Sequence, residues 1–229
     1  MLVGFLVGWL MTMVLKSSAA RPVFAEAAYA EQINLAQWLA AGKLKSFNRN
    51  VEKLQSDAVH LDDGVHINEK PGPGIVWVDG TDFSEGILEV DVRGRDVLQR
   101  SFVGIAFHGG ISGTYEAVYV RPFNFRASDP VRHKHGVQYI APPEHDWQPL
   151  REKFPDEFEN SVDQTIVPTD WVHLRVVVKG TTIQAYVGPA TSPALTVRKL
   201  GQQDHGSVGL WTGNNSDGDF ADLRITPIK

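Results

Sequence analysis

The sequence predicts an all-β protein in which two antiparallel sheets pack against each other. Three observations support this prediction. Short runs rich in β-branched and aromatic residues recur after residue 42, and Gly-, Pro- and Asp-containing turn signals separate them. Two of the runs alternate between apolar and polar residues, as a strand with one solvated face does. Only residues 25–41 favour a helix, which argues against alternating strands and helices.

The chain begins with an apolar run, Leu2–Leu15. This run is shorter than the roughly 20 residues of a membrane-spanning helix but has the length of a secretory signal. Cleavage-like patterns end at three alanines, Ala20, Ala25 and Ala30. Basic residues follow the run rather than precede it, so an uncleaved anchor stays open. We expect residues 1–30 to be a signal peptide or N-terminal anchor, the protein to be exported to the periplasm or the medium, and any membrane contact to involve this segment alone.

Residues 31–42 predict a short helix, because apolar side chains recur there at helical spacing and Gly42 follows. Residues 43–229 then form a single domain. Its expected strands are, in chain order, Val65–Asn68, Gly74–Val78, Gly86–Arg93, Phe102–His108, Glu116–Phe123, Val137–Ala141, Val172–Lys179, Ile183–Val187, Ala194–Lys199, Val208–Thr212 and Phe220–Thr226.

The pattern within these runs predicts which faces are solvated. The runs 86–93 and 172–179 carry apolar residues on one face and charged or polar residues on the other. The run Phe102–Phe107 is apolar on both faces, which predicts a central strand. Glu116, Val118 and Val120 share one face of the next run, opposite an aromatic and basic face.

Composition excludes several classes of function. Among 229 residues, 22 are Lys or Arg and 27 are Asp or Glu, so the net charge is −5 and nucleic acid is not an expected partner. The absence of cysteine excludes disulfides, thiolate nucleophiles and Cys-ligated zinc. Neither a GxSxG motif, a GxGxxG fingerprint nor a P-loop is present.

The residues best suited to ligand binding lie in the middle third. Tyr119, Arg121 and Phe123 alternate along one strand face, and an arginine between two aromatic rings is typical of a ligand-binding surface rather than a closed core. A small molecule or oligosaccharide is the expected ligand. Residues 141–169 contain no convincing strand and carry Trp147, a candidate platform for stacking a sugar. This segment is either a flap over a groove or a solvated loop covering a sheet edge.

Metal binding is not the favoured interpretation. His133 and His135, with His108 and His145 nearby in sequence, lack the spacing of a known metal motif. The Asp217–Asp219 turn resembles an oxygen-rich calcium loop, but capping by Asp side chains explains the same residues. We therefore expect no cofactor, with structural calcium near Asp217 and Asp219 as the lesser alternative.

The succession GILEVDVRGRD, SFVGIAFHGG, YEAVYVRPFNF, HGVQYIAPPEHDW, DWVHLRVVVKG and GSVGLWTGNNSDGDFADLRI resembles the 3-keto-disaccharide hydrolase-like domain family over residues 43–229. The resemblance implies a secreted bacterial domain with a concanavalin A-like jelly roll. It also implies elimination chemistry on a glycoside whose sugar carries a 3-keto group: a base removes the C2 proton, the C1 substituent leaves, and water adds back.

Such a reaction needs a general base and a donor to the enolate oxygen. The candidate bases are His108, His135, Tyr139 or a carboxylate of residues 141–169. Arg121 or Gln138 would hold the enolate or a sugar hydroxyl. The candidate site thus comprises His108, Arg121, His135 and Tyr139 as catalytic residues, and Tyr119, Phe123, Asn124, Gln138 and Trp147 as substrate-binding residues.

Two functions from different classes stay open. The first is an exported hydrolase of modified sugars with a cleft around Arg121. The second is a carbohydrate-binding module that uses the same face without a base. A perturbed titratable group beside Arg121 favours the enzyme, whereas exposed coplanar aromatic rings without such a group favour the module. A third, weaker alternative is a structural β-sandwich in which Tyr119 and Phe123 are covered.

Overall fold

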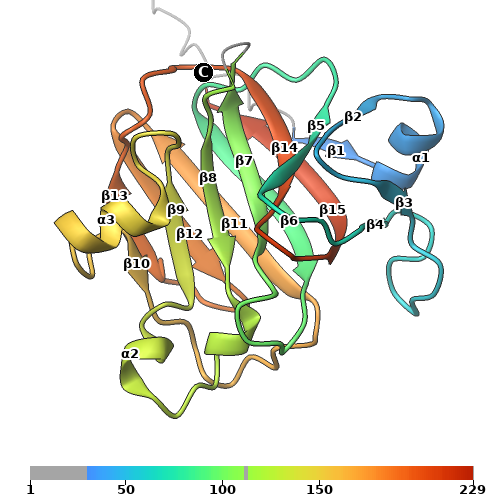
Figure 1. The fold of residues 1–229 in the computed structure, drawn as a ribbon. Helices are drawn as coiled ribbons and strands as arrows, with labels where there is room; N and C mark the ends of the chain where they lie inside the picture. Colours follow the sequence, from blue (N-terminus) through green and yellow to red (C-terminus); the bar gives the residue numbers. More distant parts are fainter. Residues whose placement is uncertain (1–29, 111–112, 229) are drawn as a thin grey trace, which may run out of the picture.

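The computed structural model describes residues 30–110 and 113–228. The chain forms two antiparallel sheets packed face to face, so the predicted all-β sandwich is confirmed (Figure 1). The expected signal or anchor over residues 1–30 lies outside the described residues, apart from Ala30. Within the described part of the chain, no helix is long and apolar enough to cross a membrane.

We call the seven-stranded layer the front sheet. Its strands, in spatial order, are β10 (Glu159–Asn160), β9 (Val137–Ile140), β8 (Glu116–Val120), β7 (Val103–Gly109), β14 (Ser207–Thr212), β5 (Gly74–Val78) and β2 (Leu44–Phe47). The strand β7 lies near the middle of this sheet, as the apolar run Phe102–Phe107 predicted. The 3₁₀ helix η1 (Pro122–Asn124) and the helix α2 (Pro130–His133) connect β8 to β9.

The back sheet has eight strands. Its main order is β13 (Leu195–Arg198), β12 (Thr182–Val187), β11 (Val172–Lys179), β6 (Gly86–Arg93), β15 (Gly218–Pro227), β4 (Val65–Ile67) and β3 (Val51–Lys53). The eighth strand, β1 (Glu31–Ile33), pairs with β15. Residues 31–42 therefore hold a strand as well as the expected helix, α1 (Leu35–Ala40), which begins after an Asn34 cap.

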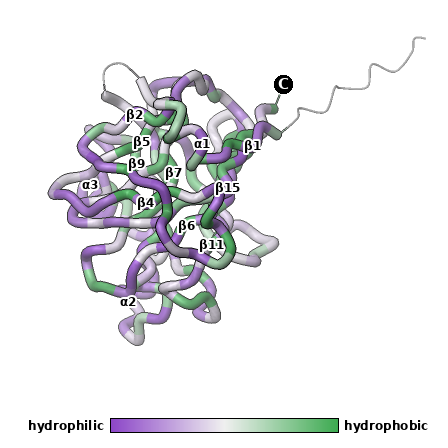
Figure 2. The backbone as a smooth tube through the Cα atoms, turned by 90° about the vertical axis from the view of Figure 1, so that its right-hand side faces the viewer, coloured by the Kyte–Doolittle hydropathy of each residue, from purple (hydrophilic) through white to green (hydrophobic). Residues whose placement is uncertain are grey.

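The core lies between the sheets. Leu88, Val90 and Val176 of the back sheet face Ile105 and Val118 of the front sheet, and all five are fully buried. The alternation predicted for residues 86–93 and 172–179 is present in β6 and β11. Hydrophobic stretches follow the strands, whereas many peripheral loops are hydrophilic (Figure 2). Residues of both faces are buried in β8 and β9, so side chains also cover the outer face of the front sheet there.

The segment 141–169 differs from the sequence prediction. It contains the helix α3 (Trp147–Lys153), whose cap Asp146 accepts a hydrogen bond from the backbone N–H of Trp147, and the two-residue strand β10. The expectation that this segment holds no strand is wrong for residues 159–160, because a strand of two residues shows no period. Since β10 pairs with β9, the segment is joined to the front sheet through backbone hydrogen bonds.

Candidate functional site

A hollow of about 500 Å³ opens beside the outer face of the front sheet, between η1, α3 and the loop before β7. We call it the Arg121 hollow. Strand register builds its floor. Tyr119 of β8 is paired with Gly104 of β7, which in turn is paired with Trp211 of β14. Because Gly104 has no side chain, the rings of Tyr119 and Trp211 meet above it and stack with centroids 4.5 Å apart.

Arg121 follows the last residue of β8 and has 4 % of its surface exposed. Its Nη2 donates to the Tyr119 hydroxyl at 2.9 Å and to Gln138 Oε1. Its Nη1 donates to the backbone oxygen of His135 at 3.2 Å and to Glu159 Oε2 at 3.3 Å. Although Arg121 lines the hollow, both terminal nitrogens of its guanidinium are committed to protein acceptors.

Glu159 holds this cluster together. Arg151 of α3 donates from Nε to Glu159 Oε1 at 2.7 Å and from Nη2 to Oε2. Burial raises the pKa of the Glu159 carboxyl, but the hydrogen bonds from Arg151 and the charge of Arg121 outweigh it and lower the pKa below its ordinary value. Glu159 is therefore a carboxylate at neutral pH, and it is 4 % exposed.

His135 is the titratable group beside Arg121. Its Nδ1 lies 2.8 Å from Glu159 Oε2, and its side chain reaches the hollow. Burial lowers the pKa of His135, and the charges of Arg151 and Arg121 act in the same direction against the pull of Glu159. The ring is therefore neutral at pH 7. His135 Nδ1 and Glu159 Oε2 do not meet hydrogen-bond geometry, but the adjacent negative charge favours the tautomer with its proton on Nδ1, which leaves Nε2 as the acceptor.

An exposed aromatic side chain forms one wall of the hollow. Trp147, the first residue of α3, is 42 % exposed, and the Arg151 guanidinium lies over its ring at 5.2 Å from the centroid. On the opposite side, Phe102 packs edge-on against Phe123 with centroids 5.4 Å apart. Phe123 is buried but lines the hollow, as do Tyr119 and Trp211.

The remaining predicted binding residues serve the hollow indirectly. Asn124 lines it, but its Nδ2 donates to the backbone oxygen of His135 at 3.1 Å and its Oδ1 accepts from Arg132 Nε at 3.3 Å. Gln138 is fully buried beneath the floor and accepts hydrogen bonds from Tyr119 and Arg121. The hydrogen bonds of Asn124 and of Gln138 Oε1 position neighbouring side chains, whereas Gln138 Nε2 is buried without a hydrogen-bond partner among the described residues.

Two predicted catalytic residues lie elsewhere, and their placement beside Arg121 is corrected. His108 and Tyr139 are buried between the sheets, where His108 Nδ1 is 2.7 Å from Glu116 Oε1 and the Tyr139 hydroxyl donates to Glu116 Oε2. Tyr139 is paired with the core residue Val118 and so faces inward. Burial also raises the pKa of Tyr139. His108 has a left-handed φ of 52°, which breaks the strand alternation that would point it outward.

The Asp217–Asp219 turn is engaged by cations. Arg95 Nε lies 2.6 Å from Asp217 Oδ1, while Asp219 pairs with His66 at 2.6 Å and with Arg93 at 2.7 Å. Among the residues that the structure describes, no cluster of three or more His, Asp or Glu side chains could hold a metal ion. These ion pairs give both carboxylates a cationic side-chain partner, and the calcium alternative stays a prediction.

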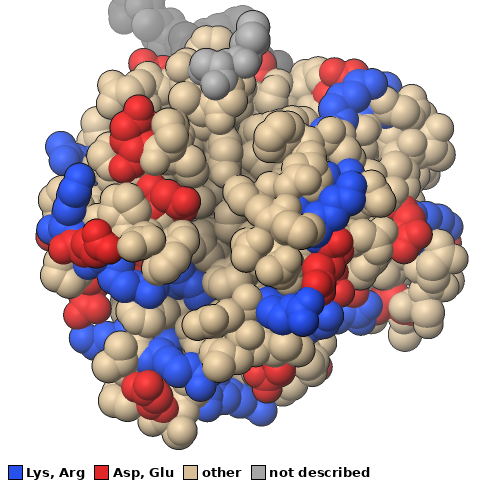
Figure 3. All heavy atoms as spheres, viewed as in Figure 1, with Lys and Arg blue, Asp and Glu red and all other residues tan. Residues whose placement is uncertain are grey.

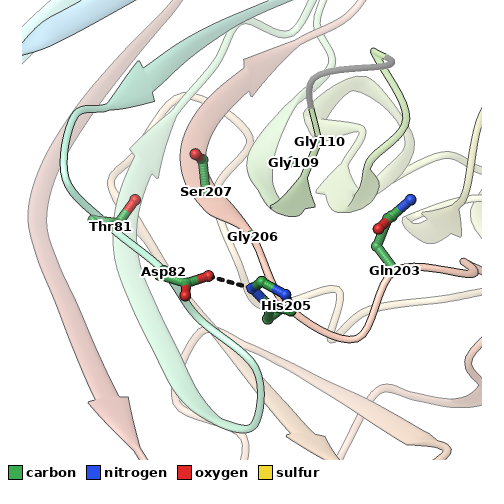
Figure 4. Close-up of a pocket in the computed structure, with 8 residues that line it drawn as sticks. All are labelled: Thr81, Asp82, Gly109, Gly110, Gln203, His205, Gly206 and Ser207. Carbon is green, nitrogen blue, oxygen red and sulfur yellow. Dashed lines mark hydrogen bonds and ion pairs between the residues drawn. The ribbon is translucent and has the colours of Figure 1, made fainter.

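A second, more open hollow of about 560 Å³ lies where β7 ends and β14 begins. It is lined by glycines and polar residues (Figure 4). Asp82 and His205 form an exposed pair there, with Asp82 Oδ1 2.7 Å from His205 Nδ1. Neither residue belongs to the Arg121 cluster. The wall of this second hollow lacks an exposed aromatic ring among the described residues, so the Arg121 hollow is the better candidate for sugar binding.

Sequence reasoning missed the site roles of Arg132, Arg151 and Trp211. A signal for Arg151 was present: it follows Trp147 by four residues, a spacing that brings two side chains together on a helix. The roles of Arg132 and Trp211 depend on η1, α2 and strand register, which no local pattern reveals.

No protein-family model matches the chain, and no curated protein does either. Solved structures do resemble it. A galectin-like protein of unknown function from Bacillus subtilis matches with a TM-score of 0.55 and 11 % identity, over 87 % of this chain and 95 % of that one. The carbohydrate-binding module CBM66 from Bacillus subtilis gives 0.52 and 12 %, over 77 % and 93 %.

A putative glycosyl hydrolase from Parabacteroides distasonis has a TM-score of 0.50 and 10 % identity, over 82 % of this chain and 89 % of that one. At such low identity these likenesses establish the fold alone. The chain has the concanavalin A-like jelly roll that the resemblance implied, whereas its specific assignment to the 3-keto-disaccharide hydrolase-like family is not confirmed.

Proposed function

We propose that this protein is carbohydrate-active and binds an oligosaccharide in the Arg121 hollow. The observation that carries the proposal is the exposed Trp147 ring on the wall of a hollow that is lined by aromatic, arginine and amide side chains. Two fold neighbours, a carbohydrate-binding module and a putative glycosyl hydrolase, support the same class of ligand. The N-terminal apolar run supports the further proposal that the protein is exported.

The hollow offers both kinds of contact that a sugar requires. The apolar face of a pyranose ring stacks on an aromatic plane, and its hydroxyls need donors and acceptors at the rim. Trp147 supplies the plane. Among the residues that the structure describes, Asn214 Nδ2 and Arg151 Nη1 have no hydrogen-bond partner. Both side chains lie along the lining, and His135 adds a ring nitrogen.

Binding is tested by calorimetric titration of a panel of neutral and acidic oligosaccharides against the protein and its Trp147→Ala variant. We expect the variant to fold normally and to bind at least tenfold more weakly, because an exposed ring contributes little to stability and much to stacking. Phe47→Ala is the matched control, since Phe47 is 63 % exposed on the distant strand β2. Equal binding by Trp147→Ala and the unmodified protein would remove the hollow from consideration.

A second candidate function is elimination on a 3-keto-glycoside, and neutral His135 is the observation that favours it. In this proposal His135 Nε2 takes the C2 proton, and the C2–H electron pair goes into an enolate. The enolate expels the C1 oxygen with its aglycone as the C1–C2 double bond forms, and the leaving oxygen receives the proton held by His135. Water then adds its hydroxyl to C1 and its proton to C2, which completes the hydrolysis. Both terminal nitrogens of Arg121 are committed, so Arg151 Nη1 is the better donor to the enolate oxygen. His108 and Tyr139 are buried outside the hollow and take no part.

Turnover is measured by mass spectrometry on disaccharides and on their 3-keto derivatives. The elimination predicts cleavage of the keto forms alone and its loss in His135→Gln. His145→Gln serves as the control, because His145 is nearby in the chain but does not line the hollow. If His135→Gln keeps full turnover, another base acts. If no substrate is cleaved while sugars still bind, the protein is a binding module.

A further inference from the structure

We infer that the Arg121 hollow selects a sugar that carries an anionic group, either a carboxylate or a sulfate ester. The inference rests on the proposed carbohydrate binding and concerns the class of sugar. Basic side chains gather on the face below α3 and around α2 (Figure 3). Three of them, Arg121, Arg132 and Arg151, line the hollow itself.

The carboxylates around the hollow do not balance these three guanidinium groups. Glu159 takes ion pairs from both Arg121 and Arg151. Asp146 also lines the hollow, and its Oδ1 accepts the backbone N–H of Trp147 as the cap of α3. Arg132 has no carboxylate of residues 30–110 or 113–228 within ion-pair distance. Around the hollow there are therefore three guanidinium groups and two carboxylates, which gives a local excess of positive charge, although the whole chain carries a net charge of −5.

Two of these arginines also have a guanidinium nitrogen without a hydrogen-bond acceptor among the described residues. Arg132 donates from Nε to Asn124 Oδ1 at 3.3 Å and from Nη2 to the backbone oxygen of Phe123 at 2.9 Å, which leaves its Nη1 free. Arg151 uses Nε and Nη2 on Glu159 and likewise leaves Nη1. Both side chains are half-buried, so they are held in place yet reachable.

A charged acceptor uses such donors better than a hydroxyl does. Hydrogen bonds from a guanidinium to an anion are about twice as strong as neutral ones. The Arg151 guanidinium lies over one face of the Trp147 indole, so a sugar that stacks on this ring is brought close to Arg151. A carboxylate or sulfate on that ring can then accept from the free nitrogens of Arg151 and Arg132, whereas a neutral sugar leaves this positive charge without a partner.

The experiment compares matched ligand pairs by calorimetry. Oligomers of galacturonate, glucuronate and alginate are set against their methyl-esterified or neutral counterparts, and sulfated galactan oligosaccharides against desulfated ones. We expect at least one acidic member to bind tenfold or more tightly than its neutral partner. Raising the salt concentration should weaken the acidic ligand and leave neutral ligands unchanged. Which acidic set binds identifies the anionic group.

Two variants locate the effect. Arg132→Ala should lose about tenfold in affinity for the acidic ligand and little for a neutral one, whereas Arg132→Lys should keep part of the preference. Arg126→Ala is the control, because Arg126 is exposed outside the hollow and donates to the backbone oxygens of Gln164 and Thr165. Equal or tighter binding of neutral sugars would overturn this inference and leave the proposed function standing. Failure of every sugar to bind would overturn both.

Discussion

Replacing Glu159 with glutamine removes the charge that Arg121 and Arg151 share. Arg121 is 4 % exposed and cannot recover hydration, although it keeps neutral acceptors on Tyr119 and Gln138. Arg151 is half-buried and recovers part of its hydration. Removing one partner of a buried ion pair costs about 3–5 kcal/mol, and these compensations place Glu159→Gln near the lower end, at about 3 kcal/mol. For a domain of this size that loss lowers Tm by about 6–12 °C.

Denaturant unfolding at neutral pH measures this loss. Glu157→Gln is the control, because Glu157 precedes Glu159 by two residues, is exposed, and has no ion-pair partner among the described residues. The control should change stability by less than about 0.5 kcal/mol. The folded-state pKa of Glu159 is lowered, so its contribution is present above the unfolded carboxyl pKa and is lost as pH falls through the folded one. The variant and the unmodified protein should therefore converge in acid. A loss below about 1 kcal/mol at pH 7 would refute the reasoning that Glu159 neutralises a buried charge.

Two further predictions concern the floor of the site and the back sheet. In Gly104→Ala, a Cβ would lie 2.2 Å from the backbone oxygen of Val118 and 2.5 Å from Tyr119 Cα, so we expect a loss of about 2–3 kcal/mol in unfolding free energy together with weaker sugar binding. Unchanged stability and binding would show that the floor can move. The hydrogen bond to Asp219 raises the pKa of His66, so its contribution is present below the unfolded pKa and is lost as pH rises through the folded one. The stability advantage over His66→Gln should therefore shrink between about pH 6 and pH 8, and a difference that grows over this range would contradict the pairing.

Strand periodicity was sufficient to predict the sandwich and the shared face of Tyr119 and Arg121. Period-2 alternation identifies which side chains point together, and in β6 and β8 nothing interrupts it. The same rule failed for His108, where a left-handed residue and a register shift between Ser207 and Gly209 change the direction of the side chain.

Contacts between side chains that are distant in the chain could not be predicted from the sequence, for a different reason. Glu159 reaches Arg121 because β10 pairs with β9 and places Glu159 opposite Gln138. A strand of two residues has no sequence pattern from which this register could be predicted. The commitment of Arg121 to interior acceptors follows from that pairing. Four histidines, His108, His133, His135 and His145, were considered together because they are near one another in the chain. Of these four, the structure brings only His135 to the hollow.

The central claim is that sugar binds on the outer face of the front sheet at the Arg121 hollow. Titration of the isotope-labelled protein with the tightest-binding oligosaccharide, followed through its tryptophan indole N–H signals, tests this directly. We expect shifts for Trp147 and Trp211, which line the hollow, and none for Trp38 or Trp171, which do not. Saturable shifts confined to Trp38 or Trp171, with Trp147 unchanged, would contradict it.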